Sequence, residues 1–280
     1  MRGLSTVEWI VNHPLSKGRR AQNIARFLAW QMRSRFIRRP HVFETANGAK
    51  MWAISGMTGA TGNLYVGLHE FEEMAFLLHF LRRGDLFADV GANVGSYTIL
   101  AAVAVGTDVI AFEPGESALA WLMRNIELNG VVDRVEVRRE AVGAKSGVVF
   151  FTSGLDTMNR ISPDDGTDVV PITMLDMVCT TVPSLIKIDV EGFEADVLRG
   201  ARDILGKPAA QAVIMELNDD AAPEFLKGLG FTCCSYDPFA REITTREGSA
   251  TGNGIFVRDI ESVQRRLREA PPFSIRGRLI

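Results

Sequence analysis

The sequence is short of cysteine and of long apolar runs. Its 280 residues include only three cysteines, Cys179, Cys233 and Cys234. The last two are neighbours in an expected strand, where successive side chains point to opposite faces, so neither a disulfide framework nor a zinc-ligand spacing follows. The N-terminus lacks the apolar core of a signal peptide, and no apolar run nears the ~20 residues that cross a bilayer. We therefore expect a cytoplasmic protein that is soluble or at most peripheral to a membrane.

Acidic residues are scarce at the two ends of the chain, although the formal net charge is -3. Glu8 is the single acid of residues 1–40, which carry nine Lys and Arg side chains, and residues 265–278 are also rich in arginine. Such ends suit an anionic surface, whether membrane, glycolipid or nucleic acid. They equally suit a solvated helix face that is docked on the chain's own acidic domain. The sequence leaves both interpretations open.

The N-terminal third of the sequence predicts a helix, a hairpin and a second helix. Asn47-Gly48 indicates a tight hairpin turn, because both residues tolerate positive φ angles. We expect residues 55–63, rich in glycine and threonine, to form a loop, and residues 71–81 to form a helix that ends at Gly84. Before the hairpin, an amphipathic helix is expected among the arginines of residues 17–39, ended by Pro40, with apolar positions Ile24, Phe27, Leu28, Met32, Phe36 and Ile37.

From Asp85 onward, apolar strands alternate with helices. This pattern is typical of an α/β protein with a mostly parallel sheet covered on both faces. A polar loop at 153–168 separates two β segments, 148–152 and 169–173, and exceeds the usual connection length, so it is a candidate functional segment. Core strands are expected at 86–90, 109–112, 134–138, 185–190 and 212–217, followed by 231–236 and 254–257 around a polar loop.

A glycine-rich turn joins the first of these strands to the following helix. Asp89 precedes Gly91 and Gly95, whereas a dinucleotide turn would read Gly-x-Gly-x-x-Gly. About twenty residues further on, Glu113 stands at the tip of the next strand, where a carboxylate can accept both hydroxyls of a ribose. An acid at Asp89 would repel a pyrophosphate but suits an ammonium. The turn therefore favours S-adenosylmethionine over NAD, with a purely structural strand-to-helix turn as the alternative.

The strand expected at 185–190 carries charges where a parallel sheet is usually apolar. Alternation places Lys187, Asp189 and Glu191 on one side of the sheet. A structural salt-bridge cluster is one explanation, since buried charges are normally paired. The carboxyl ends of adjacent strands bound the ligand crevice, however, and this strand should adjoin the first one. Asp189 is therefore the first candidate for binding or deprotonating an acceptor, Glu191 the second, and Glu216 a neighbour from the next strand.

Further polar residues extend this candidate site. Asn159, in the polar loop, is placed to hydrogen-bond cofactor or acceptor, or to form an ordinary Asx turn. Asp189, Glu216 and Asp219 offer oxygen ligands suited to magnesium, an option that we consider less favoured than metal-free chemistry. His69 is an alternative base, although His69 and His79 do not make a ligand pair.

Several motifs in order resemble the FkbM family of S-adenosylmethionine-dependent methyltransferases across residues 64–217. The resemblance implies a class I, Rossmann-like methyltransferase fold, whose seven-stranded, mostly parallel sheet ends in an antiparallel strand and has helices on both faces. The motifs are Phe87-Ala88-Asp89-Val90-Gly91-Ala92-Asn93-Val94-Gly95, Phe112-Glu113-Pro114, Thr173-Met174-Leu175-Asp176, and Ile186-Lys187-Ile188-Asp189-Val190-Glu191-Gly192-Phe193-Glu194 with Val197-Leu198 and Gly200-Ala201.

The resemblance also implies methylation of a hydroxyl on a sugar, glycan, lipid or polyketide-type acceptor. Glu113 would then be the ribose ligand, and Ala141-Val142 would form the adenine wall. The methionine-side contacts carried over by position are Asp89, Gly91, Asn93 and Gly95.

The chain thus divides into a basic helical arm (1–40), a hairpin and helix cap (41–84), the methyltransferase domain (85–258) and a basic tail (259–280). Other functions remain open. A nucleic-acid methyltransferase could use the basic ends, but the Asn-Pro-Pro-Tyr-type motif is absent. A nicotinamide oxidoreductase would need a third glycine in the turn, which this sequence lacks. A non-catalytic partner protein that binds the cofactor is the remaining alternative. The acceptor and the oligomeric state cannot be deduced from the sequence.

Overall fold

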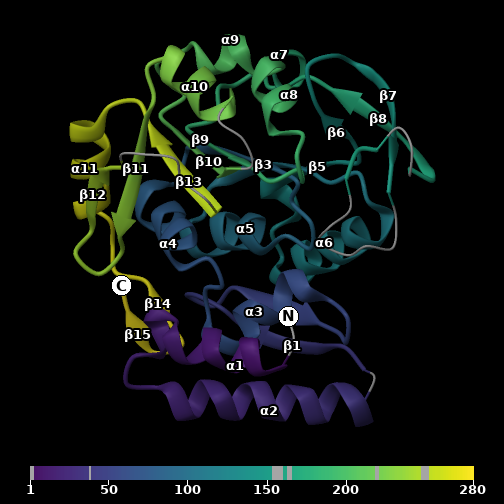
Figure 1. Ribbon diagram of the computed structural model, residues 1–280, viewed down its shortest axis with the longest axis vertical. Helices are drawn as coiled ribbons and strands as arrows, with labels where there is room; N and C mark the ends of the chain where they lie inside the picture. Colours follow the sequence, from purple (N-terminus) through teal and green to yellow (C-terminus); the bar gives the residue numbers. More distant parts are fainter. Residues whose placement is uncertain (1–2, 38, 153–159, 163–165, 218–220, 247–251) are drawn as a thin grey trace.

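The computed structural model describes residues 3–37, 39–152, 160–162, 166–217, 221–246 and 252–280. A central sheet with helices on both faces forms the main body, and a smaller cap lies below it in Figure 1. Within the described residues, no helix combines the length and the apolar character needed to cross a bilayer.

The main sheet has eight strands in the order β12-β11-β13-β10-β9-β3-β4-β5. Neighbours from β10 to β5 are parallel, whereas β13 runs antiparallel to both β10 and β11. This confirms the α/β fold with a mostly parallel sheet, and it confirms that the strand of 185–190 adjoins the first one. The strands are β3 (Leu86–Val90), β4 (Asp108–Phe112), β5 (Val135–Arg138), β9 (Leu185–Ile188), β10 (Ala212–Leu217), β11 (Thr232–Asp237), β12 (Glu242–Thr245) and β13 (Gly252–Val257).

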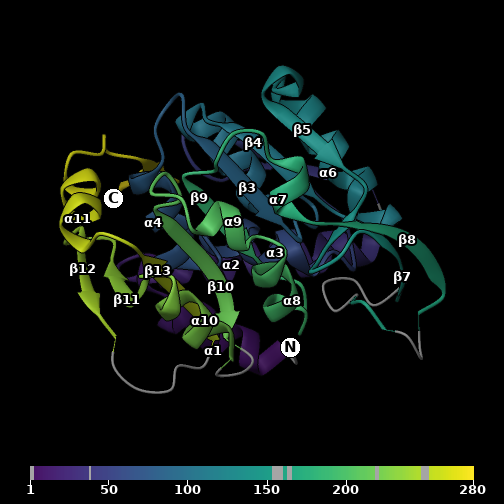
Figure 2. The ribbon, with the colours of Figure 1, turned by 90° about the horizontal axis from the view of Figure 1, so that it is seen from above.

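Two differences from the expected sheet concern its edges. β12 lies inside the polar loop that was predicted between the strands 231–236 and 254–257. It pairs with β11 and so adds an edge strand to the seven that were expected. A separate three-stranded sheet, in the order β6-β8-β7, lies beside the β5 edge (Figure 2). Its strands are β6 (Ala141–Val142), β7 (Gly147–Phe151) and β8 (Asp168–Thr173).

Helices cover the two faces of the main sheet with separate apolar cores. One core contains Phe87 and Leu185 and is covered by α4, α5 and α6, while the other contains Ala88 and Ile186 and is covered by α7 to α10. Alternate residues of each strand thus enter opposite cores, as the pleat requires. The helices are α4 (Phe71–Phe80), α5 (Ser96–Ile99) with a π-helical continuation (Leu100–Val105), α6 (Glu116–Asn129), α7 (Leu175–Val178), α8 (Glu194–Arg199), α9 (Arg202–Leu205), α10 (Ala221–Gly228) and α11 (Ile260–Arg268).

The cap is built from the N-terminal helices and the predicted hairpin. Asn47 (φ 44°) and Gly48 (φ 83°) make the expected left-handed turn. The expectation of a loop at 55–63 is wrong, because a helix begins at Thr58. Its glycines disfavour a helix locally, but Gly62 leaves room for the ring of His69, which a Cβ there would meet at 2.3 Å. The cap elements are α1 (Gly3–Asn12), α2 (Arg20–Phe36), β1 (His41–Glu44), β2 (Lys50–Ala53) and α3 (Thr58–Val66).

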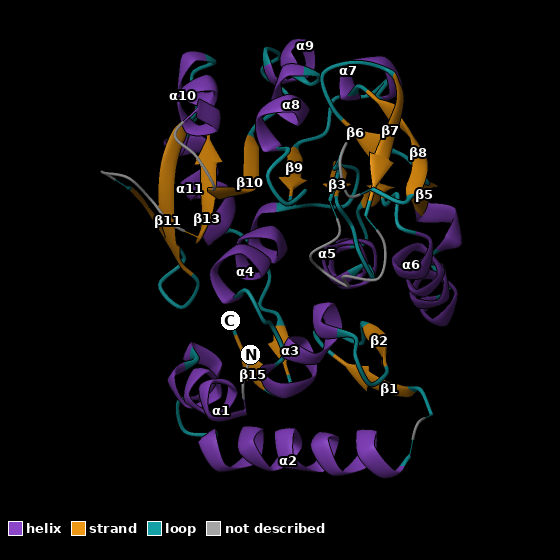
Figure 3. Ribbon diagram, turned by 45° about the vertical axis from the view of Figure 1, so that its right-hand side comes forward, coloured by secondary structure: helices purple, strands orange, loops and turns teal. Residues whose placement is uncertain are grey.

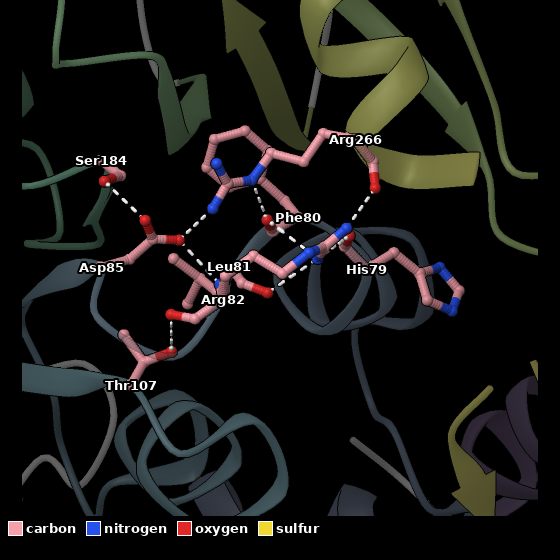
Figure 4. Close-up of polar contacts among 8 residues, drawn as sticks. All are labelled: His79, Phe80, Leu81, Arg82, Asp85, Thr107, Ser184 and Arg266. Carbon is pink, nitrogen blue, oxygen red and sulfur yellow. Dashed lines mark hydrogen bonds and ion pairs between the residues drawn. The ribbon is translucent and has the colours of Figure 1, made fainter. Parts of the chain in front are cut away.

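Both ends of the chain are anchored to this framework. Arg266 of α11 binds the carboxylate of Asp85, at the start of β3. The same carboxylate accepts hydrogen bonds from the Arg82 backbone N–H (2.7 Å) and the Ser184 hydroxyl (3.4 Å) (Figure 4). These contacts fix the C-terminal helix to the amino end of the sheet.

The last residues form a short hairpin that packs on the cap. Its strands are β14 (Ser274–Ile275) and β15 (Arg278–Leu279). Asn47 of the first hairpin accepts a hydrogen bond from the Ser274 backbone N–H (2.7 Å), and Arg19 donates to the carbonyl oxygen of Arg276 (2.6 Å). The two basic ends of the sequence therefore meet in one substructure.

Candidate active site

A cavity of about 700 Å³ opens at the carboxyl ends of β3, β4, β9 and β10, facing the cap. It is the crevice expected where parallel strands end beside the turns that follow them. One part of its wall is contributed by the glycine turn, Glu113 and β6. The other part is contributed by Lys187, Asp189, Glu191, Glu216, Asn253 and the cap residues His69 and Glu70.

The turn requires glycine at two positions because of its backbone conformation and its close contacts with neighbouring chain segments. Gly91 (φ 79°) and Asn93 (φ 51°) both line the cavity in left-handed conformations. A Cβ at Gly91 would lie 1.9 Å from the carbonyl oxygen of Asp189, so the turn can contact the end of β9 only through glycine. Gly95 (φ 90°) is outside the cavity wall, and a Cβ there would lie 2.6 Å from Leu122. Gly95 therefore serves helix packing in this structure.

Glu113 joins the turn to the end of β4. Its Oε2 accepts a hydrogen bond from the backbone N–H of Asn93 (2.8 Å), and its Oε1 accepts one from Gly115 (2.7 Å). Burial raises the pKa of Glu113 to about 7, against the opposing effect of these two donors. Each carboxylate oxygen keeps further acceptor capacity toward the cavity, because it has two lone pairs.

Asp89 lies behind the cavity wall. Its side chain is fully enclosed, and its Oδ2 accepts a hydrogen bond from the Thr98 hydroxyl at 2.6 Å. Its Oδ1 has no partner among the described residues. Burial raises the pKa of Asp89, whereas the nearby Lys187 ammonium lowers it. The structure thus places a buried carboxyl group behind the glycine turn and does not place Asp89 in direct contact with the cavity.

An ion pair between a buried lysine and a partly exposed aspartate lies at the end of β9. Lys187 Nζ is 2.9 Å from Asp189 Oδ2 and 4.8 Å from the ring centroid of Tyr97. Burial lowers the pKa of Lys187, but the carboxylates of Asp189 and Asp89 outweigh it and raise the pKa above the usual value. The ammonium therefore stays charged and interacts with two carboxyl groups, Asp189 in the cavity wall and Asp89 behind it.

The strand ends earlier than expected, which changes the geometry of Glu191. β9 stops at Ile188, and Glu191 (φ 52°) and Gly192 (φ 93°) turn the chain in left-handed conformations. The expected alternation is wrong beyond Ile188. Nevertheless, the side-chain oxygens of Asp189, Glu191 and Glu216 lie within 4.8 Å of one another. Burial first, and then the adjacent carboxylates of Glu216 and Asp189, raise the pKa of Glu191.

A second network on the cavity wall was not anticipated from the sequence. Glu70 accepts hydrogen bonds from the Tyr97 hydroxyl (2.8 Å) and the Asn253 amide (3.0 Å). Asn253 of β13 is the cross-strand partner of Glu216. These residues come from the N-cap of α4, from α5 and from β13, so no local motif unites them. Tyr97, which directly follows the glycine turn, was the single available signal.

The remaining candidates have mixed placements. Ala141 and Val142 of β6 line the cavity. His69 also lines it, but from the turn before α4, where its ring packs 5.0 Å from that of Trp9. Asn159 and Asp219 lie outside the described residues, so their predicted roles stay predictions, and of the magnesium set the structure brings together Asp189 and Glu216. Lys187 already places a positive charge beside Asp189, as a bound metal ion would do.

Comparisons with known proteins agree with one another. The family model of the methyltransferase FkbM domain matches residues 89–243, more than half of the chain. The hexuronic acid methyltransferase AglP of Haloferax volcanii is 24% identical over 227 residues, covering 72% of this chain and 85% of that protein. The 31-O-demethyl-FK506 methyltransferase FkbM of Streptomyces tacrolimicus is 28% identical over 208 residues, covering 58% and 79%.

Among solved structures, a methyltransferase FkbM from Methylobacillus flagellatus KT matches with a TM-score of 0.47 and 15% identity. The match covers 84% of this chain and 60% of that one. The chain belongs to the FkbM family of S-adenosylmethionine-dependent methyltransferases.

Proposed function

We propose that this protein transfers the methyl group of S-adenosylmethionine to a hydroxyl oxygen of a sugar, glycan, lipid or polyketide-type acceptor. One observation carries the proposal: a single cavity unites Glu113 with the Lys187–Asp189 ion pair. The first offers acceptors for a ribose, and the second offers a charged hydrogen-bond acceptor for an alcohol. The named activities of the two curated relatives, on a hexuronic acid and on 31-O-demethyl-FK506, support an oxygen acceptor.

The cofactor half of the cavity fits a cationic nucleoside. Glu113 would hold the ribose, Ala141 and Val142 would contact the adenine, and the turn at Gly91 and Asn93 would face the methionine end. The buried carboxyl group of Asp89 lies behind this turn, and its Oδ1 has no partner among the described residues, so it offers an acceptor to a ligand that carries positive charge. Bound there, S-adenosylmethionine would supply an electrophilic methyl group on a sulfonium.

The acceptor half has the groups that an alcohol needs. Asp189, paired with Lys187 at 2.9 Å, would accept a hydrogen bond from the hydroxyl and orient its oxygen. Glu191 is better suited to take the proton, because its raised pKa brings it nearer to the working pH, as a general base requires. We therefore assign Asp189 to orientation and Glu191 to proton removal.

The charge of the wall bears on the class of acceptor. Glu70, Asp189, Glu191 and Glu216 all line the cavity, while Lys187 is the one Lys or Arg side chain in the described wall. A carboxylate acceptor would meet this acidic wall with repulsion, whereas a neutral polyol would find hydrogen-bond acceptors. We therefore propose a neutral hydroxyl acceptor rather than the carboxylate of a uronic acid.

A labelled-methyl assay tests this function. The purified chain is incubated with S-adenosylmethionine that carries an isotopic methyl group, and with neutral glycosides, macrolide alcohols, lipid alcohols, the corresponding uronic acids, RNA and DNA. We expect label in a hydroxyl ether of a neutral acceptor. Label in a carboxyl ester would contradict the acceptor class, and label in RNA or DNA would replace the whole proposal. Tight cofactor binding without transfer to any acceptor would indicate a non-catalytic partner protein.

A further inference from the structure

The outer face of α2 is apolar and has no partner in the structure. Its exposed residues include Leu28 (51%), Met32 (60%) and Phe36 (85%), which recur at every fourth position and so form one stripe. Ala21, Ala25 and Ala29 are also exposed and extend the stripe toward the start of the helix. Figures 1 and 3 show α2 as the outermost element of the cap, on the side away from the main sheet.

The opposite face of α2 is firmly packed. Phe27 and Trp30 are buried in the apolar core of the cap. Asn23, also buried, donates a hydrogen bond from its amide to the Ser16 hydroxyl at 2.8 Å. The sequence predicted one apolar face for this helix, and the structure shows two. Because the inner face already anchors the helix, the outer stripe is not needed to hold α2 in place.

Positive charge surrounds the stripe. Arg20, Arg35 and Arg39 are exposed, and Arg35 follows Met32 by three residues, which places it at the edge of the stripe. Residues 9–43 contain no acidic side chain. Among the described residues, no salt bridge joins an arginine of α1, α2 or their connection to any carboxylate. The expected docking of this helix on its own chain is thus present through the inner face, but no carboxylate among the described residues pairs with its arginines.

We propose that the outer face of α2, formed by Leu28, Met32, Phe36 and the flanking arginines, binds the surface of an anionic lipid bilayer. An exposed apolar stripe with arginine at its edges is the pattern of helices that lie in the plane of a membrane interface. Lipid headgroups would neutralise the arginines while the stripe enters the acyl boundary. A second copy of the chain fits less well, because pairing two such faces would bring arginines together.

Vesicle flotation with the full-length protein tests this proposal. We expect binding to vesicles of phosphatidylcholine with about 30 mol% phosphatidylglycerol, and little binding to phosphatidylcholine alone. Raising the salt from about 0.1 M to about 0.5 M should weaken binding, because it screens the arginines. The triple variant L28S, M32S, F36S and the double variant R35Q, R39Q should each bind at least about tenfold more weakly.

Matched controls lie on the far side of the molecule. Met177 of α7 is 67% exposed, and Lys207 follows α9 and is also exposed, so M177S and K207Q repeat the chemistry away from α2. Both should bind vesicles like the unmodified protein. Thermal unfolding of every variant shows whether the fold is retained, independently of any cofactor or acceptor.

Three outcomes would overturn the proposal. The first is absence of binding to anionic vesicles, and the second is equal weakening by the control variants. The third is a dimer in light scattering that the triple serine variant splits, together with no vesicle binding, which would make this face a contact between copies. None of these outcomes concerns methyl transfer, so the proposed function and the membrane proposal fail separately.

Discussion

Lys187 Nζ lies 2.9 Å from Asp189 Oδ2, and the two side chains differ sharply in exposure, at 7% for the lysine and 40% for the aspartate. The buried ammonium also lies over one face of the Tyr97 ring, 4.8 Å from its centroid. The carboxylate is left partly open toward the cavity. The pair therefore has a structural half and an accessible half, which makes Asp189 the member that an acceptor can reach.

Asp189→Asn is predicted to lower turnover by about 10² or more while the affinity for S-adenosylmethionine changes little. Asparagine keeps the size but removes the charge that orients the hydroxyl. Steady-state kinetics and calorimetric titration of the cofactor measure the two effects separately. Asp196→Asn is the control, since Asp196 also forms an ion pair, with Arg199 at 2.8 Å, but in α8 and outside the cavity wall. A wild-type rate for Asp189→Asn would return the pair to a purely structural role.

Glu113→Gln is predicted to weaken binding of S-adenosylmethionine about tenfold or more, since a charge-assisted hydrogen bond contributes ~1.5 to 3 kcal/mol. The amide of glutamine would also face the N–H of Asn93 or Gly115 with a donor. Calorimetric titration with S-adenosylhomocysteine, the product that the cofactor leaves after methyl transfer, measures the loss of affinity. Glu116→Gln changes a neighbouring carboxylate that is 79% exposed at the start of α6 and should bind normally. Unchanged affinity in a folded Glu113 variant would remove the ribose assignment.

Cofactor affinity is predicted to rise with pH through about 7, the pKa to which burial raises Glu113. Ribose hydroxyls donate to the ionised carboxylate, so affinity should fall below this value toward that of the neutral variant Glu113→Gln. The effect on folding has the opposite sign. The folded pKa exceeds the ordinary value of 4.5, so the contribution of Glu113 to stability is complete below about pH 4.5 and is lost as pH rises through about 7.

Titrations at about pH 6 and about pH 8 test this dependence, which should disappear in Glu113→Gln. Affinity is a better readout than stability, because burial also raises the pKa of Glu73 to about 7. A pH profile that is the same in the variant would assign the titration to another group.

Gly91→Ala is predicted to destabilise the protein by more than about 3 kcal/mol and to abolish cofactor binding. A Cβ there would lie 1.9 Å from the Asp189 carbonyl oxygen, so β3 and the end of β9 would have to separate. Gly84→Ala is the matched control. It has a similar φ of 91° but open space around the added atom, and should cost about 1 to 2 kcal/mol. Urea unfolding compares the two, and equal losses would show that backbone strain alone matters.

Trp30→Ala is predicted to lower the free energy of unfolding by about 3 to 5 kcal/mol, whereas Leu28→Ala should change it by no more than about 0.5 kcal/mol. Both residues lie on α2, but Trp30 is 6% exposed and Leu28 is exposed on the outer stripe. Urea unfolding measures both. Similar small effects would mean that residues 1–40 form a detachable arm, and a large effect for Trp30 alone would make them part of the folded core.

Much of the fold could be predicted because it depends on local patterns. Apolar runs bounded by turns indicated the parallel strands, and β10 has the bounds that were expected. Asn47-Gly48 indicated its turn, since few residues adopt positive φ without strain. The charged positions Lys187 and Asp189 were informative for the same reason, because a charge in a parallel sheet requires a partner. The roles assigned to them in catalysis stay predictions.

The sequence by itself determined the order of the parallel strands and of the helices between them, the glycine turn and the charge at the end of β9, since each follows from neighbouring residues. Only the tertiary structure decided what meets across the cavity. Glu70 joins Tyr97 and Asn253 through long-range hydrogen bonds, and Gly62 in α3 leaves the space that the ring of His69 fills. Glu191 comes close to Asp189 and Glu216 through a left-handed turn. Likewise, which apolar face of α2 is buried depends on the core that it meets, and no pattern within the helix specifies that choice.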